Sequence, residues 1–267
     1  MKLVESIVTN NPCYKAGKKI TVKGLMLHSV GCPQPSAKEF IKNWNKASYN
    51  RACVHGFIDA NDGTVYQTLP WNHRGWHGGG TSNNTHIGVE MCEPNCIKYT
   101  SGSSFTCSDT TKAKAMVKRT YEAAVELFAM LCKQYKLNPL AKGVIVSHKE
   151  GHSLGIASNH GDPEHLWSQL KTGYTMDGFR KAVKAKMDAE EKPVQTTPTS
   201  STAGYKVKVT SDVLNVRAGA GMTYKVTTTV KKGEVYTIVE EKKNGSTTWG
   251  KLKSGVGWIS LTHTKKC

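Results

Sequence analysis

The chain has 267 residues, of which 38% are hydrophobic, enough for one or two domains with at least one buried core. It contains no run of 18 apolar residues and no signal-peptide-like run near its start, so we expect a soluble protein made in a cytosol, without a membrane span. The formal net charge of +17 predicts attraction to a polyanion, whether a nucleic acid, an anionic membrane or a bacterial wall polymer.

Helical and strand-like segments alternate over the first part of the chain. Ser36, with Glu39 three residues later, predicts a capping box at the start of a helix. Apolar residues at three- and four-residue steps predict a long helix over 108–136 and a last helix over 175–187. Five short apolar runs have strand character: 24–30, 56–60, 64–70, 86–91 and 143–148. Helices mixed with a sheet predict an α/β sandwich.

A change of composition divides the chain at residues 188–204, which are polar, contain two prolines and predict a linker. Residues 1–187 then form one predicted domain and residues 205–267 a second. In the second domain, short β-rich runs are separated by turn signals such as AGAG, KKG and SGVG. Many short strands at close spacing predict a small all-β barrel.

Ionisable residues lie at or near the ends of three predicted strands. His28 follows the apolar run GLML, His148 follows GVIVS, and Glu90 lies within HIGVEM. A buried ionisable group is costly unless it is paired, hydrogen-bonded or bound to a metal. Taken singly, each of these residues could be a hydrogen-bonded core residue or a surface residue at a strand end.

Residues 160–165, HGDPEH, contain two histidines and two carboxylates but no large apolar residue. Glycine and proline there argue against a helix. If this loop meets the strand ends, His28, His148 and Asp162 make a three-ligand zinc site. The fourth position stays open for water, as in catalytic zinc sites. A metal would hold the polar loop in one shape, and His160 would project beside it.

Other histidine patterns have ordinary explanations. The histidines of HKEGH are four residues apart, as in a helical zinc-protease motif, but its glycine and the preceding β-rich run argue against a helix. His152 and His165 are therefore expected at the surface or behind the ligands. The glycines of WHGGGTSNN follow no strand-to-helix pattern, so a phosphate cradle is not expected.

The cysteines could provide a second metal site. Cys92, Cys96 and Cys107 could hold a structural zinc, but no fourth ligand is evident. Buried thiols or a facultative disulfide are the alternative interpretations.

Five segments occur in a familiar order: GLMLHSV, VHGFIDANDGTVYQTLPWNHRGWHGGG, NNTHIGVEM, VSHKEGH and HGDPEHLW. Over about residues 20–185 they resemble the zinc-dependent N-acetylmuramoyl-L-alanine amidases of the type-2 amidase family. That family includes T7-lysozyme-like amidases and peptidoglycan recognition proteins. The resemblance implies a mixed sheet flanked by helices. It also implies that zinc-activated water hydrolyses the amide between N-acetylmuramic acid and L-alanine.

Matched by motif, the resemblance places the zinc ligands at His28, His148 and Asp162. It places the catalytic glutamate at Glu90, which would take a proton from water and return it to the departing amine. His160 stands where many members have lysine, and the resemblance implies that it stabilises the oxyanion.

The resemblance also places His55, Trp76 and His77 where the groove of the family contacts substrate. Aromatic packing and surface hydrogen bonding are alternative roles for these three residues.

The C-terminal segment LNVRAGAGMTYKVTTTVKKGEVYTIV, with the later WGKLKSGVGWISL, resembles a bacterial SH3 domain, a wall-binding module. An amidase, a linker and such a module form the arrangement of phage and prophage endolysins of Gram-positive hosts. The resemblance implies a peptidoglycan substrate, with anionic wall polymers as further partners of the basic surface. It also implies synthesis in the bacterial cytoplasm without a signal peptide, and action on the cell wall after release.

The sequence is compatible with three alternatives. A bacterial autolysin would have the same activity. A non-catalytic peptidoglycan-binding protein would share the fold, but the three candidate ligands together with Glu90 favour an enzyme. A nucleic-acid-binding protein would explain the charge, yet the sequence has no basic helix and no aromatic-basic strand pattern.

Overall fold

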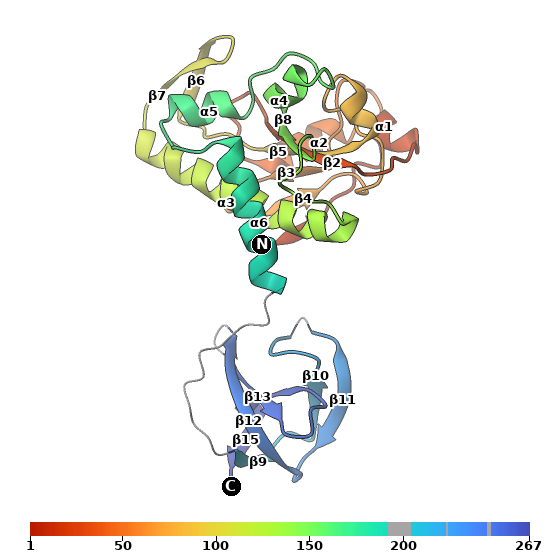
Figure 1. Ribbon diagram of the computed structural model, residues 1–267, viewed down its shortest axis with the longest axis vertical. Helices are drawn as coiled ribbons and strands as arrows, with labels where there is room; N and C mark the ends of the chain where they lie inside the picture. The colour runs from red at the N-terminus through yellow and green to blue at the C-terminus, as the bar shows by residue number, and fades with distance from the viewer. Residues whose placement is uncertain (192–203, 223, 245–246) are drawn as a thin grey trace. The chain divides into compact units, whose positions relative to one another are not determined.

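The chain forms two compact units, Met1–Val194 and Gln195–Cys267, which are described separately (Figure 1). The computed structural model describes residues 1–191, 204–222, 224–244 and 247–267. Within the predicted linker 188–204, residues 188–191 form the end of a helix, and residues 192–203 lie outside the described part. Within the described ranges, none of the helices combines the length and the apolar content that crossing a membrane requires.

The first unit is built on a six-stranded mixed sheet with the order β1-β4-β3-β5-β2-β8. Its strands are β1 (Leu3–Glu5), β2 (Gly24–Ser29), β3 (Gly56–Ile58), β4 (Val65–Gln67), β5 (His86–Met91) and β8 (Ile145–Ser147). β3, β5, β2 and β8 are parallel to one another, whereas β4 is antiparallel to β3. All five strands expected from the sequence are present, which confirms the predicted α/β class.

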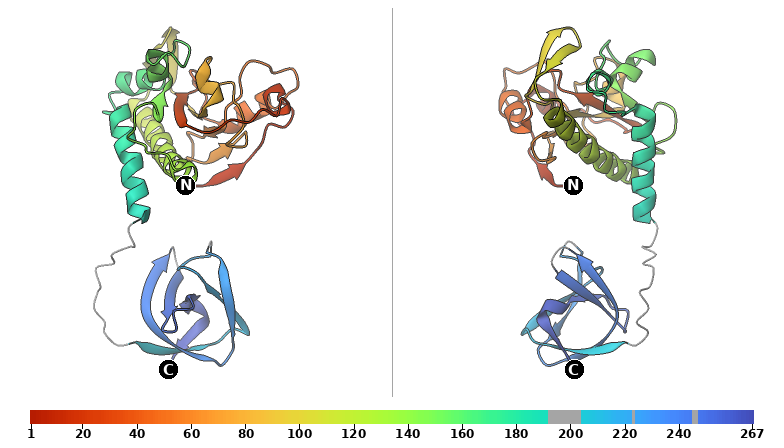
Figure 2. Two further views of the ribbon diagram at one scale, coloured as in Figure 1. Left: turned by 45° about the vertical axis from the view of Figure 1, so that its right-hand side comes forward. Right: turned by 90° about the vertical axis from the view of Figure 1, so that its left-hand side faces the viewer.

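Helices cover both faces of this sheet (Figure 2). α3 (Thr110–Tyr135) and α6 (Met176–Glu191) pack against each other on one face, around a core that includes the apolar residues of β2 and β5. α2 (Ala37–Trp44) packs on the other face, where the ring of Phe40 stacks on Phe57 of β3 with centroids 5.0 Å apart. The sheet is therefore buried on both sides.

The predicted helices are confirmed, although one predicted cap is wrong. The helix expected over 108–136 is α3, which begins after Asp109, and the last expected helix is α6. Ser36 precedes α2, but its side chain makes no capping hydrogen bond. The amide of Glu39 instead bonds the main-chain oxygen of Ser36, so the predicted capping box does not form.

Several short elements lie outside the main sheet. They are α1 (Pro12–Lys15), η1 (Thr81–Asn84), β6 (Ile97–Ser101), β7 (Ser104–Cys107), α4 (His148–Ser153) and α5 (Glu164–Gln169). β6 and β7 form a hairpin that the sequence patterns did not predict.

α4 corrects the expectation that HKEGH is not helical. The side chains of Ser147 and Glu150 form a complete capping box that starts the helix directly after β8. Gly151 is buried, and a Cβ there would lie 2.7 Å from Cε of Met26. The glycine that argued against a helix therefore permits close packing of the helix on the sheet.

The strand register places polar residues on one face of the sheet. His28 of β2 pairs with Glu90 of β5, which in turn pairs with Phe57 of β3. Paired residues of neighbouring strands point to the same side, and successive residues alternate. His28 and Glu90 therefore lie on the same side as Phe57 and α2, whereas Leu27 and Val89 point toward α3 and α6.

The second unit is a seven-stranded antiparallel sheet with the order β11-β10-β14-β13-β12-β9-β15. Its elements are β9 (Tyr205–Val209), β10 (Val213–Arg217), β11 (Val226–Lys231), β12 (Val235–Asn244), β13 (Thr247–Leu252), β14 (Trp258–Ser260), η2 (Leu261–His263) and β15 (Thr264–Lys266). The core consists of small aliphatic residues, among them Val207, Val216 and Ile259. This unit confirms the all-β fold predicted for the C-terminal part.

Candidate active site

Neighbouring strand ends and one loop bring four predicted site residues together. His28 lies near the end of β2, Glu90 lies beside it in β5, and His148 is the first residue after β8. Because β5, β2 and β8 are parallel neighbours, their carboxyl ends share one edge of the sheet. Asp162 reaches this edge from the loop before α5.

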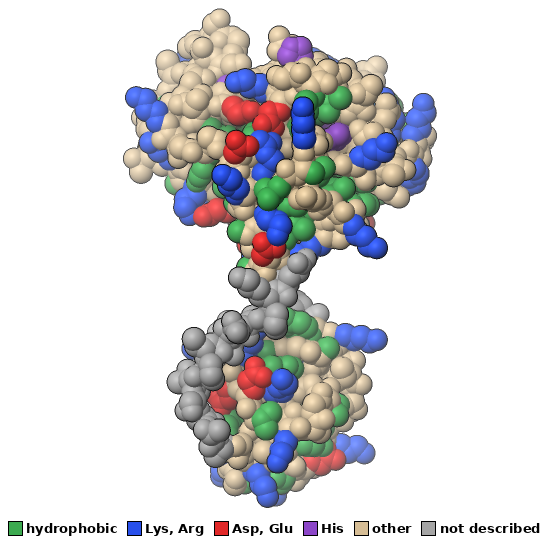
Figure 3. All heavy atoms as spheres, in the orientation of Figure 1, with side chains coloured by type: hydrophobic (Ala, Val, Ile, Leu, Met, Phe, Trp, Pro, Cys, Tyr) green, Lys and Arg blue, Asp and Glu red, His purple; other side chains and the backbone are tan. Residues whose placement is uncertain are grey.

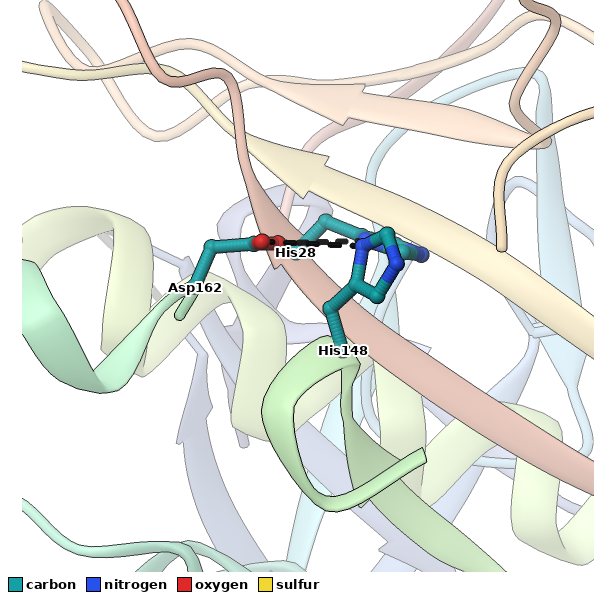
Figure 4. A group of neighbouring side chains, drawn as sticks. All are labelled: His28, His148 and Asp162. Carbon is teal, nitrogen blue, oxygen red and sulfur yellow. Dashed lines mark hydrogen bonds and ion pairs between the residues drawn. The ribbon is translucent and has the colours of Figure 1, made fainter. Parts of the chain in front are cut away.

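The side chains of His28, His148 and Asp162 converge (Figure 4). His28 Nδ1 lies 3.1 Å from His148 Nδ1 and 3.2 Å from Asp162 Oδ2. His148 Nδ1 lies 3.5 Å from Asp162 Oδ1. Only 1% of the His28 side chain is exposed and 13% of that of Asp162, so this polar group is largely removed from water.

These three residues fit a metal ion. Zinc bonds of about 2.0 to 2.2 Å at tetrahedral angles place neighbouring ligand atoms about 3.3 to 3.6 Å apart. The three observed separations, 3.1 to 3.5 Å, come close to that range. Two imidazole nitrogens and one carboxylate oxygen are a donor set that zinc accepts, with one position left open.

The electrostatics of the group follow from burial and mutual contact. Burial lowers the pKa of His28, but its hydrogen bond to Asp162 and the charges of Glu90 and Asp162 outweigh burial and leave that pKa raised. Burial raises the pKa of Asp162, but the contacts with His28 and His148 leave it below its usual value. Burial, together with the charge of His28, lowers the pKa of His148 to about 4, so His148 is neutral at pH 7.

Glu90 is a carboxyl group without a partner for one of its oxygens. Its Oε2 atom is buried and accepts no hydrogen bond within the described part of the chain. Burial raises the pKa of Glu90 to about 8, and the charge of nearby Asp162 adds to the increase. A carboxyl group in this state can accept and return a proton near neutral pH.

His160 packs against His148 at the Nε2 edge of that ring. Its Nδ1 atom is 3.2 Å from His148 Nε2, and the two rings meet edge to face with centroids 4.4 Å apart. His160 is exposed and lines a cavity that also includes Asp162. Only Nε2 of His160 is left for a reacting group.

The three predicted substrate contacts have different placements. His55 is fully buried, and its two ring nitrogens bond the oxygen of His73 and the amide of Gly88. It therefore belongs to the core and not to a substrate-facing surface. Trp76 is partly buried and packs on an apolar cluster of the N-terminal segment. His77 stands behind His28, with its Nδ1 atom 3.1 Å from His28 Nε2.

A buried polar network near the site was missed by the sequence analysis. The hydroxyl of Tyr99 donates to Glu93 Oε2 at 2.7 Å and lies 2.7 Å from His165 Nε2. Glu93 is fully buried, and its Oε1 atom accepts from the amide of Gly31. Burial raises the pKa of Glu93 to about 7. His165 thus lies behind the site, one of the two placements expected for it. Tyr99 lies in the β6–β7 hairpin, which the sequence patterns did not predict, so its contact with the site could not be foreseen.

Tyr99 and His165 belong to the wall of a cavity of about 580 Å³. The cavity is bordered by the end of β2, the turn between β6 and β7, and the loop that carries His160 and Asp162. Its lining is mainly polar, with hydroxyl and amide groups from Ser29, Ser103 and Asn159. The size and the hydrogen-bonding groups suit a polar ligand placed next to the three converging side chains.

The cysteines do not form the alternative metal site within the described residues. All eight lie in the described ranges and are free thiols. Cys92 is buried, and the Sγ atom of Cys96 donates to the main-chain oxygen of Asp109 at 3.4 Å. His28, His148 and Asp162 make up the group found there whose ligand atoms could hold a metal.

Comparison with known families agrees with the fold. Residues 18–165, more than half of the chain, match the family described as N-acetylmuramoyl-L-alanine amidase. The chain belongs to this amidase family. Residues 212–264 match the bacterial SH3 domain, which covers most of the second unit. The amidase match includes His28, Glu90, His148 and Asp162.

Two relatives illustrate how far the similarity extends. The N-acetylmuramoyl-L-alanine amidase CwlH of Bacillus subtilis (strain 168) is 35% identical over 89 residues, which are 32% of this amidase-family chain and 33% of CwlH. The present chain thus spans about a third of the length of this curated relative. The hydrolase AmiA of Staphylococcus aureus, solved in complex with its ligand, superposes with a TM-score of 0.54 at 18% identity. That superposition covers 72% of the present chain and 85% of AmiA, and it supports the fold.

The raised pKa of Glu90 predicts a pH-dependent stability of the metal-free amidase-family chain. The folded chain keeps a proton on Glu90 up to pH about 8, whereas the unfolded chain releases it near the ordinary value of 4.5. The free energy of unfolding should therefore fall as pH rises through this window. Glu90→Gln should remove this pH dependence. The difference in the free energy of unfolding between Glu90→Gln and the wild type should therefore change by on the order of 2 to 4 kcal/mol between pH 5 and pH 9.

Urea unfolding in EDTA at several pH values measures this effect. Glu122→Gln, on the exposed side of α3, is the matched control and should follow the wild type. If the curves of Glu90→Gln and wild type stay parallel over the whole range, Glu90 does not hold a proton in the folded chain.

Proposed function

We propose that this chain is a zinc-dependent N-acetylmuramoyl-L-alanine amidase. It hydrolyses the amide between the lactyl group of N-acetylmuramic acid and the L-alanine of the stem peptide. Membership of the amidase family supports this proposal. The observation that carries it is the convergence of His28, His148 and Asp162 within 3.5 Å of one another, next to the unpartnered carboxyl oxygen of Glu90.

In the proposed reaction each residue has a separate task. His28, His148 and Asp162 would hold zinc, which when bound polarises a carbonyl and lowers the pKa of water. Glu90 takes a proton from the attacking water and returns it to the nitrogen of the departing L-alanine. His160 donates an N–H to the oxyanion as it develops, a contribution of about 3 to 4 kcal/mol for a well-placed donor.

The polar cavity beside Asp162 provides a place for the substrate next to these groups. Main-chain and side-chain groups of Ser29, Ser103 and Asn159 can hydrogen-bond a glycan or peptide there. We infer that this cavity holds one side of the scissile amide, with His160 close to the reacting carbonyl.

The second unit is proposed to attach the enzyme to the cell wall, as its bacterial SH3 family suggests. Lys and Arg side chains are spread over the visible face of both units, in keeping with the net charge of +17 (Figure 3). A cavity of about 500 Å³ in the second unit is lined by four lysines: Lys208, Lys232, Lys265 and Lys266. We propose that anionic wall polymers bind there in addition to peptidoglycan.

The strand register at this cavity supports an anionic ligand. Lys265 of β15 is directly opposite Lys208 of β9, and both side chains are exposed. Like charges in opposed cross-strand positions are destabilising. A bound polyanion would relieve this repulsion.

An endolysin that waits in the bacterial cytoplasm and acts on the wall after release fits this combination of units. An autolysin of the same activity differs from it in gene neighbourhood and not in chemistry. The alternative of a non-catalytic binder is disfavoured because the three ligand candidates and Glu90 are all present and close together.

Digestion of Gram-positive peptidoglycan tests the proposed activity. The wild type should release new L-alanine amino termini without new reducing sugar ends, and EDTA should abolish this until zinc is restored. Glu90→Ala should keep about one zinc per chain but lose activity by about 100-fold or more, because general acid–base catalysis is removed. Glu122→Ala is the control on an exposed position. New reducing ends, or full activity of Glu90→Ala, would contradict the proposal.

The lysine cavity generates a second prediction for the full chain. Binding to walls that contain anionic polymer should weaken as salt rises, and Lys208→Ala with Lys265→Ala should reduce it severalfold at low salt. Lys251→Ala is a matched control, because Lys251 is already paired with Glu240 at 3.2 Å. Equal wall binding by the double variant and the control would reject the site. Amidase activity on soluble fragments should be unchanged in all variants.

A further inference from the structure

His77 stands directly behind the candidate ligand His28. His28 Nε2 lies 3.1 Å from His77 Nδ1, and His77 Nε2 lies 3.1 Å from the main-chain oxygen of His86. A carbonyl oxygen only accepts, so His77 Nε2 must carry the hydrogen. In a neutral imidazole the other nitrogen then holds a lone pair. His77 Nδ1 therefore accepts from His28 Nε2–H, which leaves His28 Nδ1 as the basic atom at the site.

The second candidate ligand is held in the same way. His148 Nε2 lies 3.1 Å from Ser158 Oγ, and that hydroxyl donates to the main-chain oxygen of Gly78 at 3.3 Å. Because the hydroxyl hydrogen is directed to Gly78, Ser158 Oγ accepts from His148 Nε2–H. His148 Nδ1 is then the atom with a lone pair, and it faces His28 Nδ1 at 3.1 Å.

Both arrangements depend on one segment, residues 77–80. The side chain of Asn83 bonds the amides of His77 and Gly78, which fixes this segment against the sheet. A Cβ on Gly88 of β5 would lie 2.3 Å from the ring of His77, and a Cβ on Gly79 would lie 2.7 Å from Ser158 Oγ. Glycines at these positions let both supporting side chains approach the ligands.

We propose that His77 and Ser158 are positioning residues that set the tautomers of His28 and His148. This inference rests on the proposed zinc-dependent function. Each supporting group accepts a hydrogen bond from Nε2–H of its histidine and donates its own hydrogen to a main-chain carbonyl, so that two Nδ1 lone pairs point at one centre with the carboxylate of Asp162. Partners of this kind affect metal affinity by about 10- to 100-fold.

The role assigned to His77 differs from a substrate contact. A substrate contact would change KM and leave zinc affinity intact. A positioning residue instead changes zinc affinity, and a residue that accepts a hydrogen bond at the same place should restore it. Asparagine can present its side-chain oxygen near the position of a histidine Nδ1, whereas leucine cannot accept a hydrogen bond.

Zinc affinity of the full chain, measured by competition with a chromophoric chelator, tests the proposal. His77→Leu should raise the zinc Kd by about 10- to 100-fold, and His77→Asn should stay close to the wild type. His86→Leu is the matched control, because the ring of His86 bonds the oxygen of Gly143 and the hydroxyl of Thr85 and does not support a ligand. An unchanged Kd for His77→Leu would overturn the proposal.

Ser158→Ala provides an independent variant in case His77→Leu does not fold. It should raise the zinc Kd by a smaller factor, because His160 Nδ1, at 3.2 Å from His148 Nε2, offers a second acceptor. Ser158→Ala combined with His160→Ala should then exceed either single change. Equal Kd values for the wild type and this double variant would overturn the proposal for His148.

Product analysis of the zinc-loaded wild type separates this inference from the proposed function. A wild type that binds zinc but forms no amidase product would refute the proposed reaction and leave the affinity comparison valid. A wild type that is active, with a zinc Kd unmoved by His77→Leu, would refute the positioning role alone.

Discussion

Two imidazole nitrogens and a carboxylate oxygen lie within 3.5 Å of one another in a largely buried position, and this arrangement constrains the rest of the first unit. Lone pairs and negative charge cannot be gathered away from water without a compensating cation. In the metal-free chain, the hydrogen bond to Asp162 and the charges of Glu90 and Asp162 raise the pKa of His28, which favours its protonated form. A zinc ion would supply the cation instead and provide reactivity. The loop around Asp162 is also held to the sheet by hydrogen bonds, because Asp162 accepts from the amides of Ser29 and Lys149.

The two faces of the sheet have different roles, and this allows a polar group to be buried on one of them. On the side of α3 and α6, a large aliphatic and aromatic core stabilises the strands. On the opposite side, His28 and Glu90 occupy the carboxyl ends of β2 and β5. Behind them, the rings of His55 and His77 hydrogen-bond to main-chain oxygens, so the polar atoms of these rings have partners. The apolar face stabilises the fold, and the polar face can therefore carry the candidate catalytic groups.

Much of this organisation could be predicted from the sequence. Apolar runs that end in His28 and His148, and the loop with Asp162, were sufficient to predict one convergent group, because parallel strands end at one edge. The order of five motifs then indicated the family. Local periodicity also predicted α3 and α6, whose apolar spacing is regular.

The errors have specific physical causes. The helix α4 was not expected because Gly151 is a poor helix former, yet the glycine lets the helix pack closely on Met26, whose side chain would have to shift to admit a Cβ. His55 was placed at the substrate groove because a sequence motif does not show which histidines are buried. The contact of Tyr99 with Glu93 and His165 joins segments up to 72 residues apart, and no local pattern reports such a contact. The supporting role of His77 depends on hydrogen-bond direction, which only the three-dimensional arrangement reveals.

X-ray absorption at the zinc edge of the metal-loaded chain tests the central claim most directly. If His28, His148 and Asp162 hold the metal, the spectrum will show only nitrogen and oxygen ligands at about 2.0 to 2.2 Å, with the outer-shell scattering of two imidazoles. A sulfur shell at about 2.3 Å would place the metal on cysteines and contradict the account.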